Sequence, residues 1–292
     1  MRYDEGHESP DLIDRRGQPA PRLAGGGGLA QVLIHLVLSR LGFGGVVVLG
    51  VAYVGLQALG VDVAGLLAGG AQSARVTPSP AGPDPQRAFV AFVLDDVQAT
   101  WERIYPGPGR YRRAKLVLFS GRTNTACGLG ESATGPFYCP ADARAYIDLD
   151  FFRTLSDRLG APGDFARAYV IAHEIGHHVQ NLTRVSERVR RAPSSDRTGS
   201  GGLSVRLELQ ADCYAGVWAH GTRQRELLEQ GDLEEALNAA ARIGDDALQR
   251  RGGGTVRPES FTHGTSAQRA RWFRRGFETG DPGACDTFSG SI

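Results

Sequence analysis

The chain contains 292 residues and carries a formal net charge of +1. This length leaves room for one substantial domain with appendages. A charge so close to neutral creates no overall field that recruits nucleic acid or an anionic surface, so nucleic acid is not an expected partner.

The N-terminal region contains one long uncharged stretch, from Leu41 to Leu59. A helix of this length spans about 28 Å, close to the hydrocarbon thickness of a bilayer. We therefore predict a transmembrane helix at 41–59 that contacts the lipid bilayer, preceded by a polar cytoplasmic segment at 1–40. The five arginines before the stretch, against two soon after it, favour a cytoplasmic N-terminus and an extracytoplasmic main domain.

Two alternatives for this stretch stay open, namely a cleaved signal peptide and a buried or peripheral hairpin. The segment before it is about 40 residues long, far longer than the n-region of an ordinary signal peptide. Residues 60–87 are rich in Pro, Gly and Ser and show no apolar period. They are predicted to be a linker to a folded domain at 88–292.

Hydrophobic periodicity in the domain predicts an α+β fold, with one helix, then short strands, then a helical second half. A helix is expected at Arg87–Ile104, followed by strands at Lys115–Phe119, around Thr125–Cys127, at Phe137–Cys139 and at Ala145–Leu149. Helices are then expected at Asp150–Leu159, Asp164–Leu182, Leu203–Ala219, Arg223–Glu229, Leu233–Gln249 and Ser266–Thr279. The polar connection at Thr183–Gly202 is predicted to be a flexible loop, with a lid as the alternative.

The helix expected at Asp164–Leu182 contains the pattern His-Glu-x-x-His, formed by His173, Glu174 and His177. Helical positions four apart lie on one face, so both imidazoles can bind a single Zn²⁺ ion, one per chain. The Glu between them then lies beside the metal, where it can act as a base. Gly176 leaves room for the close approach of another backbone.

A catalytic zinc site needs a third protein ligand and one open position. Glu208 and Asp212 are four residues apart in the next long helix, so their carboxylates project from one face. We predict that Glu208 is the third metal ligand. Asp212 is predicted to accept a hydrogen bond from the ring nitrogen of a ligand histidine that does not face the metal.

Several segments resemble a known family. The two metal motifs, with Ser204–Trp218, His263–Arg269 and Arg271–Cys285, are similar to the bacterial putative neutral zinc metallopeptidases. The resemblance covers nearly the whole chain. It implies a zincin-like metallopeptidase domain behind one N-terminal transmembrane helix, anchored in the bacterial cell membrane and acting on peptide or protein substrates. By the same topology, the strand at Ala145–Leu149 is a candidate sheet edge for pairing with a peptide, or else an ordinary core strand.

The predicted reaction is zinc-dependent hydrolysis of peptide bonds. A metal-bound water is the nucleophile, and Glu174 takes its proton as general base. His263 is a candidate catalytic donor to the developing oxyanion because its loop resembles a family signature, with a structural or helix-capping role as the alternative. The competing functions are a catalytically silent zincin-like module that regulates another envelope protein, and an intramembrane protease.

The remaining cysteine, histidine and arginine residues are given structural roles. The four cysteines allow three pairings, of which we expect Cys127–Cys139 with Cys213–Cys285, and free thiols are the alternative. His178 is expected to pack or to form local hydrogen bonds. In the last helix the aromatic residues are expected to face the core and the arginines to be solvated, namely Arg269, Arg271, Arg274 and Arg275.

Overall fold

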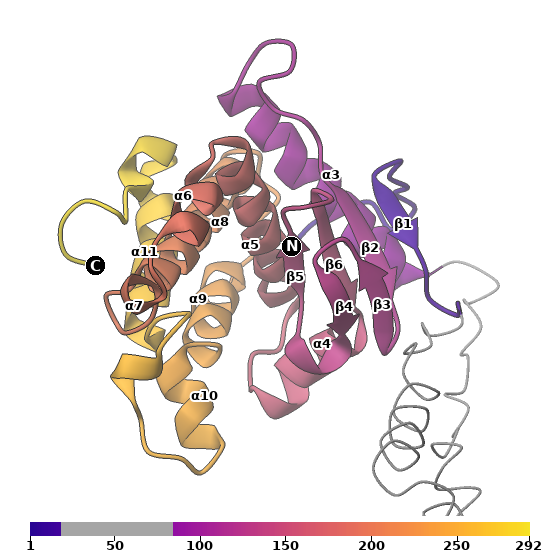
Figure 1. Ribbon diagram of the computed structural model, residues 1–292. Coiled ribbons are helices and arrows are strands. Elements are labelled where there is room, and N and C mark those ends of the chain that lie inside the picture. The colour runs from indigo at the N-terminus through magenta and orange to yellow at the C-terminus, as the bar shows by residue number, and fades with distance from the viewer. Residues whose placement is uncertain (19–83) are drawn as a thin grey trace, which may run out of the picture. The chain divides into compact units, whose positions relative to one another are not determined.

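The computed structural model describes residues 1–18 and 84–292 (Figure 1). Of these, residues 1–17 and 84–292 belong to one compact unit. The described elements form a mixed α+β domain with two small sheets, as predicted. The predicted transmembrane helix at 41–59 and most of the predicted linker at 60–87 lie outside the described residues. In the part that is described, no helix is both long and apolar enough to cross a membrane.

A four-stranded sheet has the order β1 (Leu12–Asp14), β2 (Lys115–Phe119), β6 (Arg144–Asp148) and β5 (Phe137–Cys139). The first three strands are parallel, and β5 runs antiparallel to β6. Side chains alternate between the two faces, as in any strand. Leu116 and Leu118 belong to the main core that the helices share, whereas Val117 and Phe119 belong to a small core on the other face.

The prediction that Ala145–Leu149 forms a sheet edge is wrong. Strand β6 lies between β2 and β5, so its backbone groups are paired on both sides. The edge strand on this side of the sheet is β5, which Figure 1 shows facing helix α5 (Asp164–Leu182). Any peptide that extends this sheet near the helices therefore pairs with β5.

A hairpin of β3 (Arg122–Thr125) and β4 (Gly128–Glu131) forms the second sheet. The strand predicted around Thr125–Cys127 is wrong in position, because β3 ends at Thr125 and the next two residues, Ala126 and Cys127, make the turn between the two hairpin strands. The disulfide Cys127–Cys139 ties this turn to the edge strand β5, with a Cα–Cα distance of 5.8 Å. The hairpin thereby holds β5 from one side.

Four long helices make up most of the helical half of the domain: α3 (Pro85–Ile104), α5, α8 (Leu203–Gln224) and α11 (Ser266–Thr279). The side chain of Asp84 accepts hydrogen bonds from the first amides of α3, which explains why the helix begins there. Helix α11 begins with a capping box between Thr265 and Gln268. The bounds of α5 and α11 agree with the prediction, and α3 begins two residues earlier than predicted.

Two of the shorter helices differ from the prediction. The helix predicted at Leu233–Gln249 is two helices, α9 (Asp232–Arg242) and α10 (Asp245–Arg251). They separate at Gly244, where an added Cβ would lie 2.4 Å from the amide nitrogen of Ser266. The expected helix at Arg223–Glu229 is absent from the described chain, since α8 ends at Gln224 and Glu226 has a φ of 58°.

Two other segments contain more secondary-structure elements than the sequence pattern predicted. The predicted loop at Thr183–Gly202 includes α6 (Val185–Arg191) and α7 (Ser194–Arg197). The helix predicted at Asp150–Leu159 consists of α4 (Asp150–Arg153) and a π-helical turn at Thr154–Arg158. Neither change moves the residues of the predicted metal site.

The N-terminus differs from the predicted division into a separate segment at 1–40 and a domain from 88 onward. Strand β1 joins the sheet, with Leu12 opposite Leu116. The α-amino group of Met1 donates to both carboxylate oxygens of Asp164, the first residue of α5, at 2.8 Å. Residues 1–17 are therefore part of the domain. A strand of three residues is too short for its pattern to be recognised in advance.

The predicted cysteine pairing is confirmed. Besides Cys127–Cys139, the second disulfide joins Cys213 of α8 to Cys285, which follows α11. It closes 72 residues of chain and ties the C-terminal region to the helix that carries Glu208 and Asp212. The ligand helix is thus held covalently at the position next to Asp212.

Candidate metal centre

Helices α5 and α8 contact each other closely at Gly176. A Cβ atom on this glycine would lie 3.0 Å from the carbonyl oxygen of Ala211 and 3.1 Å from its Cα. The prediction that Gly176 admits another backbone is confirmed, because any larger side chain would separate the helices. The close contact brings the motif of α5 opposite Glu208 of α8.

The structure brings the three predicted metal ligands together. The Nε2 atom of His173 lies 3.2 Å from one carboxylate oxygen of Glu208, and the Nε2 atom of His177 lies 3.4 Å from the other. One candidate ligand atom from each residue lies within 4.8 Å of the other two. Two imidazole nitrogens and one carboxylate oxygen are the protein ligands of many catalytic zinc sites.

The charges of the site are strongly coupled. Burial alone would lower the pKa of His173, but the carboxylates of Asp212 and Glu208 outweigh it and raise this pKa to about 10. Burial alone would also lower the pKa of His177, but the carboxylate of Glu208 outweighs it and raises this pKa. Burial alone would raise the pKa of Glu208, but the two imidazoles hold it well below its usual value. A divalent cation would replace the protons that these imidazoles hold.

Glu174 is buried beside the ligands, with 6 % of its surface exposed. Within the described chain its Oε2 atom has no hydrogen-bond partner. Buried carboxylate oxygens are nearly always satisfied, so an orphaned one beside three ligand atoms indicates a place for a molecule that donates a hydrogen bond. Together with the ligand types, this atom shows that the residues fit a zinc ion with one open position.

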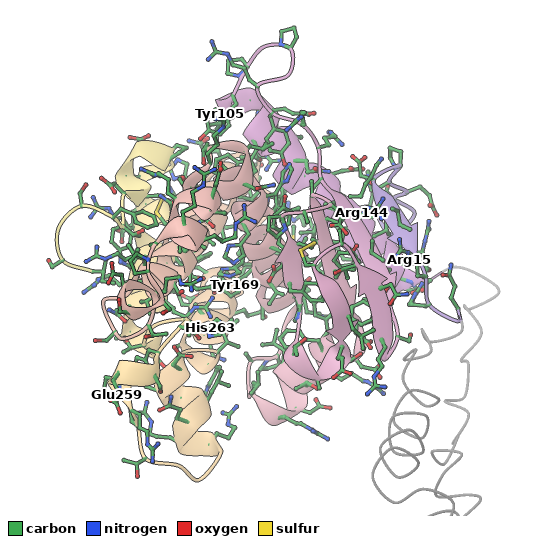
Figure 2. The ribbon with its side chains drawn as sticks, viewed as in Figure 1. Arg15, Tyr105, Arg144, Tyr169, Glu259 and His263 are labelled. Carbon is green, nitrogen blue, oxygen red and sulfur yellow. A yellow bond between two sulfur atoms is a disulfide. The ribbon has the colours of Figure 1, made fainter. Side chains whose placement is uncertain are left out.

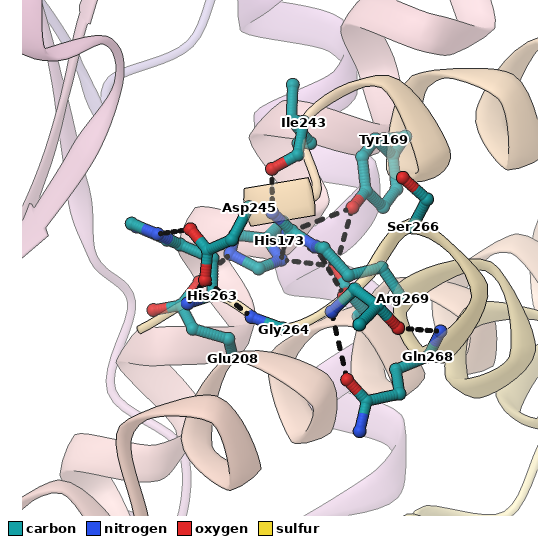
Figure 3. A network of polar contacts seen from close by, with 12 residues as sticks. Tyr169, His173, Glu208, Ile243, Asp245, His263, Gly264, Ser266, Gln268 and Arg269 are labelled. Carbon is teal, nitrogen blue, oxygen red and sulfur yellow. Dashed lines mark hydrogen bonds and ion pairs between the residues drawn. The ribbon is translucent and has the colours of Figure 1, made fainter. Parts of the chain in front are cut away.

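Asp212 contacts the Nδ1 side of His173, whereas Glu208 contacts the Nε2 side. Figure 3 shows His173 together with Tyr169 and Arg269 of the same network. The Nδ1–H of His173 donates to Asp212 at 2.8 Å. Arg269 donates to both oxygens of the same carboxylate, at 2.8 and 2.9 Å, and the hydroxyl of Tyr169 donates at 2.5 Å. Asp212 therefore has the contacts expected of a residue that fixes the tautomer and orientation of a ligand histidine.

The expectation that Arg269 is solvated is wrong. Only 2 % of this residue is exposed, whereas Arg271, Arg274 and Arg275 of the same helix are exposed. Helix α11 packs so closely on α8 that an added Cβ on Gly276 would lie 1.9 Å from the carbonyl oxygen of Cys213. Arg269 therefore lies between the helices, where its charge offsets that of the buried Asp212. The aromatic residues of α11 face the core as expected.

His263 lies in the loop before α11 and lines the same cavity as the metal ligands. Its Nδ1 atom is 3.1 Å from a carboxylate oxygen of Asp245, and 51 % of its side chain is exposed. The other oxygen of Asp245 accepts hydrogen bonds from the backbone amides of Thr262, His263 and Gly264. Asp245 thus holds both the loop and the ring, and its contact raises the pKa of His263.

Two neighbours of the motif have structural contacts. His178 packs inside the domain, as predicted, but its hydrogen bonds are not local. The hydroxyl of Tyr138 lies 2.9 Å from Nδ1, and the carbonyl oxygen of Arg112 lies 2.5 Å from Nε2. Gln180, which the sequence did not single out, lies 2.8 Å from the Nδ1 atom of His177. The only sequence signal for this contact is a spacing of three residues on one helix.

A cavity of about 920 Å³ opens over the metal ligands. Tyr169 and His263, which Figure 2 labels on the helical side of the domain, are part of its lining. The opposite wall includes Phe137 and Tyr138 of the edge strand β5. Apolar side chains predominate elsewhere in the lining, namely Pro136, Pro140, Phe151, Leu159, Val170, Val189, Ile243 and Leu248. The volume and lining are typical of a site for a small molecule or a short peptide segment.

An α+β domain in which a His-Glu-x-x-His helix meets a carboxylate of a second helix fits the zincin-like class of metalloproteins. The chain belongs to the family described as putative neutral zinc metallopeptidase, whose family model matches residues 1–288. That family implies zinc as the cofactor and peptides as the substrates.

Curated relatives cover the chain fully or in large part. The uncharacterized protein YpfJ of Escherichia coli strain K12 is 46% identical over 305 residues, which span 100% of both chains. The uncharacterized protein Rv2575 of Mycobacterium tuberculosis is 47% identical over 206 residues, or 67% of this chain and 68% of the relative. The uncharacterized protein Mb2605 of Mycobacterium bovis matches to the same extent. No solved structure matches the chain.

Proposed function

We propose that the protein is a zinc metallopeptidase that hydrolyses peptide bonds, with one zinc ion held by His173, His177 and Glu208. The observation that supports this proposal most strongly is the buried Oε2 atom of Glu174, which has no partner among the described residues and lies beside the ligands. A zinc site that only binds or stabilises has no chemical need for a free base at this position.

When bound in such a site, zinc acts as a Lewis acid and lowers the pKa of a water in its open position toward neutrality. Glu174 takes a proton at its free carboxylate oxygen and delivers it to the leaving nitrogen. Asp212 and Arg269 keep the ring of His173 in one orientation.

His263 is proposed as the donor to the oxyanion that develops on the substrate carbonyl. Its Nδ1 faces Asp245, so its Nε2 is free to donate into the cavity when the ring is protonated. His263 stands in the same cavity as Glu174 and the three ligands, which supports this role over a purely structural one.

Asp245→Asn is expected to move the alkaline limb of the pH profile of kcat/KM to lower pH. The Asp245 carboxylate raises the pKa of His263, so the protonated donor is present below this raised pKa and is lost as the pH rises through it. Removing the negative charge lowers the pKa, and the donor is lost earlier. The measurement is the pH profile with a quenched fluorescent peptide.

Asp246→Asn is the matched control, because Asp246 makes similar contacts with Ser266 and Arg250 but none with His263. Its profile should keep the wild-type alkaline limb. An Asp245→Asn profile that coincides with that of the wild type would assign His263 to the structural role.

The proposed substrates are extended, unfolded stretches of protein. Strand β5 is one of the two edge strands of the sheet and contributes to the cavity wall, so an extended peptide can pair with its backbone. The apolar lining would take large apolar side chains of such a peptide.

Removal of the metal tests the proposed function directly. The full chain, purified without chelator, is expected to cleave unfolded casein, to lose this activity in a chelator and to regain it with one equivalent of zinc. Cleavage that continues at the same rate in the presence of the chelator would contradict the proposal. Zinc binding without turnover of casein or of any other unfolded protein would favour the catalytically silent module instead. Attachment to a bacterial membrane through residues 41–59 stays a prediction.

A further inference from the structure

The second ligand histidine, His177, is held by an amide and not by a carboxylate. Its Nδ1 atom lies 2.8 Å from the Oε1 atom of Gln180, one turn further along α5. Gln180 is completely buried. The partner of His173, in contrast, is the charged Asp212. The orientation of the Gln180 amide therefore decides which ring nitrogen of His177 carries the proton.

Backbone carbonyls determine that orientation. One side-chain end of Gln180 lies 2.7 Å from the carbonyl oxygen of Leu207, which can only accept, so this end must be the NH₂ group. The same NH₂ group lies 3.1 Å from Oε1 of Gln210. The amide of Gln210 is oriented in the same way, because its other end lies 3.1 Å from the carbonyl oxygen of Cys285.

It follows that the Oε1 atom of Gln180 is left to accept from His177. In the neutral ring the proton of His177 then lies on Nδ1, and Nε2, which faces Glu208 at 3.4 Å, is left as the nitrogen that can bind zinc. The contact with Leu207 also joins α5 to the residue that directly precedes the ligand Glu208. At its far end the chain of amides reaches Cys285, which is bonded to Cys213 of α8.

We propose that Gln180 and Gln210 are positioning residues that hold His177 in its metal-binding tautomer and fix its distance to Glu208. The inference rests on the proposed function, because it assigns His177 as a zinc ligand. The inference goes beyond the proposed function because it gives His177 a neutral hydrogen-bond partner. His173, in contrast, is supported by the charged residues Asp212 and Arg269.

Zinc affinity of the full chain, measured by competition with a chromophoric chelator, provides the first test. Gln180→Leu removes both the acceptor for His177 and the donor to Leu207, so we expect zinc binding to weaken about 10- to 100-fold, as for other lost partners of ligand histidines. Gln210→Leu leaves the contacts of Gln180 with His177 and Leu207 in place, so it should weaken binding less. Because Gln210 is further from the ligands, it also serves if Gln180→Leu folds poorly.

A spectroscopic readout separates positioning from general destabilisation. In the zinc-loaded wild type, ¹⁵N-labelled histidine should give protected Nδ1–H signals from His173 and His177, to be assigned apart from those of His220 and His263, whose Nδ1 atoms also face acceptors. In Gln180→Leu the signal of His177 should exchange rapidly with solvent, while that of His173 remains. Gln224→Leu is the matched control, because Gln224 contacts a histidine that is not a ligand, His220, on the exposed part of α8.

The outcomes are distinguishable. Unchanged zinc affinity and an unchanged His177 signal in Gln180→Leu would overturn the inference and leave the proposed function intact. Loss of both signals together, or an equal effect in Gln224→Leu, would also overturn it. A wild-type chain that binds no zinc would overturn the proposed function and this inference at once.

Discussion

Replacing Glu174 by glutamine is expected to leave zinc binding intact and to reduce peptide hydrolysis by about 10²- to 10⁴-fold, the usual contribution of a general base. Glutamine has nearly the same shape, so the packing of α5 should not change. The Oε2 atom makes no hydrogen bond within the described chain, so no structural contact is lost. What is lost is the ability to accept and release a proton.

The experiment measures kcat on a peptide substrate and zinc content on the same sample. Glu187→Gln provides the control, because Glu187 lies on α6 and pairs with Arg191 at the surface. It should behave as the wild type. Residual activity of the Glu174 variant within a few fold of the wild type would exclude this residue as the base.

Glu208→Ala is expected to have the largest effect on the metal. Its carboxylate is the one ligand supplied by α8, and its two oxygens lie 3.2 and 3.4 Å from the two imidazoles. Losing a ligand should cost more than losing an outer hydrogen-bond partner, so zinc affinity should fall by more than about 100-fold. Competition with a chelator measures the affinity, and metal analysis should give one zinc per chain in the wild type only.

Glu278→Ala, on the exposed side of α11, is the control for this substitution. Circular dichroism of both metal-free variants checks that α8 is retained. The full chain is required, because residues 1–17 are part of the fold. If Glu208→Ala binds zinc as well as the wild type does, Glu208 is not a metal ligand. The alternative of a catalytically silent binding module would then be favoured.

The local patterns of the metal site could be predicted from the sequence. His173, Glu174 and His177 depend only on the helical repeat, and the bounds of α5 follow from the same repeat. Glu208 with Asp212 is a second local pattern of the same kind. For these residues the helix itself fixes which side chains share a face, and the tertiary structure only has to bring the two faces together.

Contacts between distant elements could not be predicted. Arg269 belongs to a run of arginines, and nothing in the pattern distinguishes the one that α8 buries. Asp245 becomes the partner of His263 only because the chain breaks at Gly244, which a helical repeat over Leu233–Gln249 does not show. Gln180 looks like any polar helix residue until the carbonyl of Leu207 lies opposite it.

Strand β1 constrains the sidedness of the protein. Residues 12–14 are paired with residues 116–118 in one sheet, and Arg16 pairs with Asp84 at 2.8 Å. A bilayer cannot lie between paired strands, so the sheet excludes the predicted combination of a cytoplasmic N-terminus, a single crossing and an extracytoplasmic catalytic domain. If the chain crosses a membrane on its way from β1 to α3, it must cross back as well. The first residues and the metal centre then share one compartment.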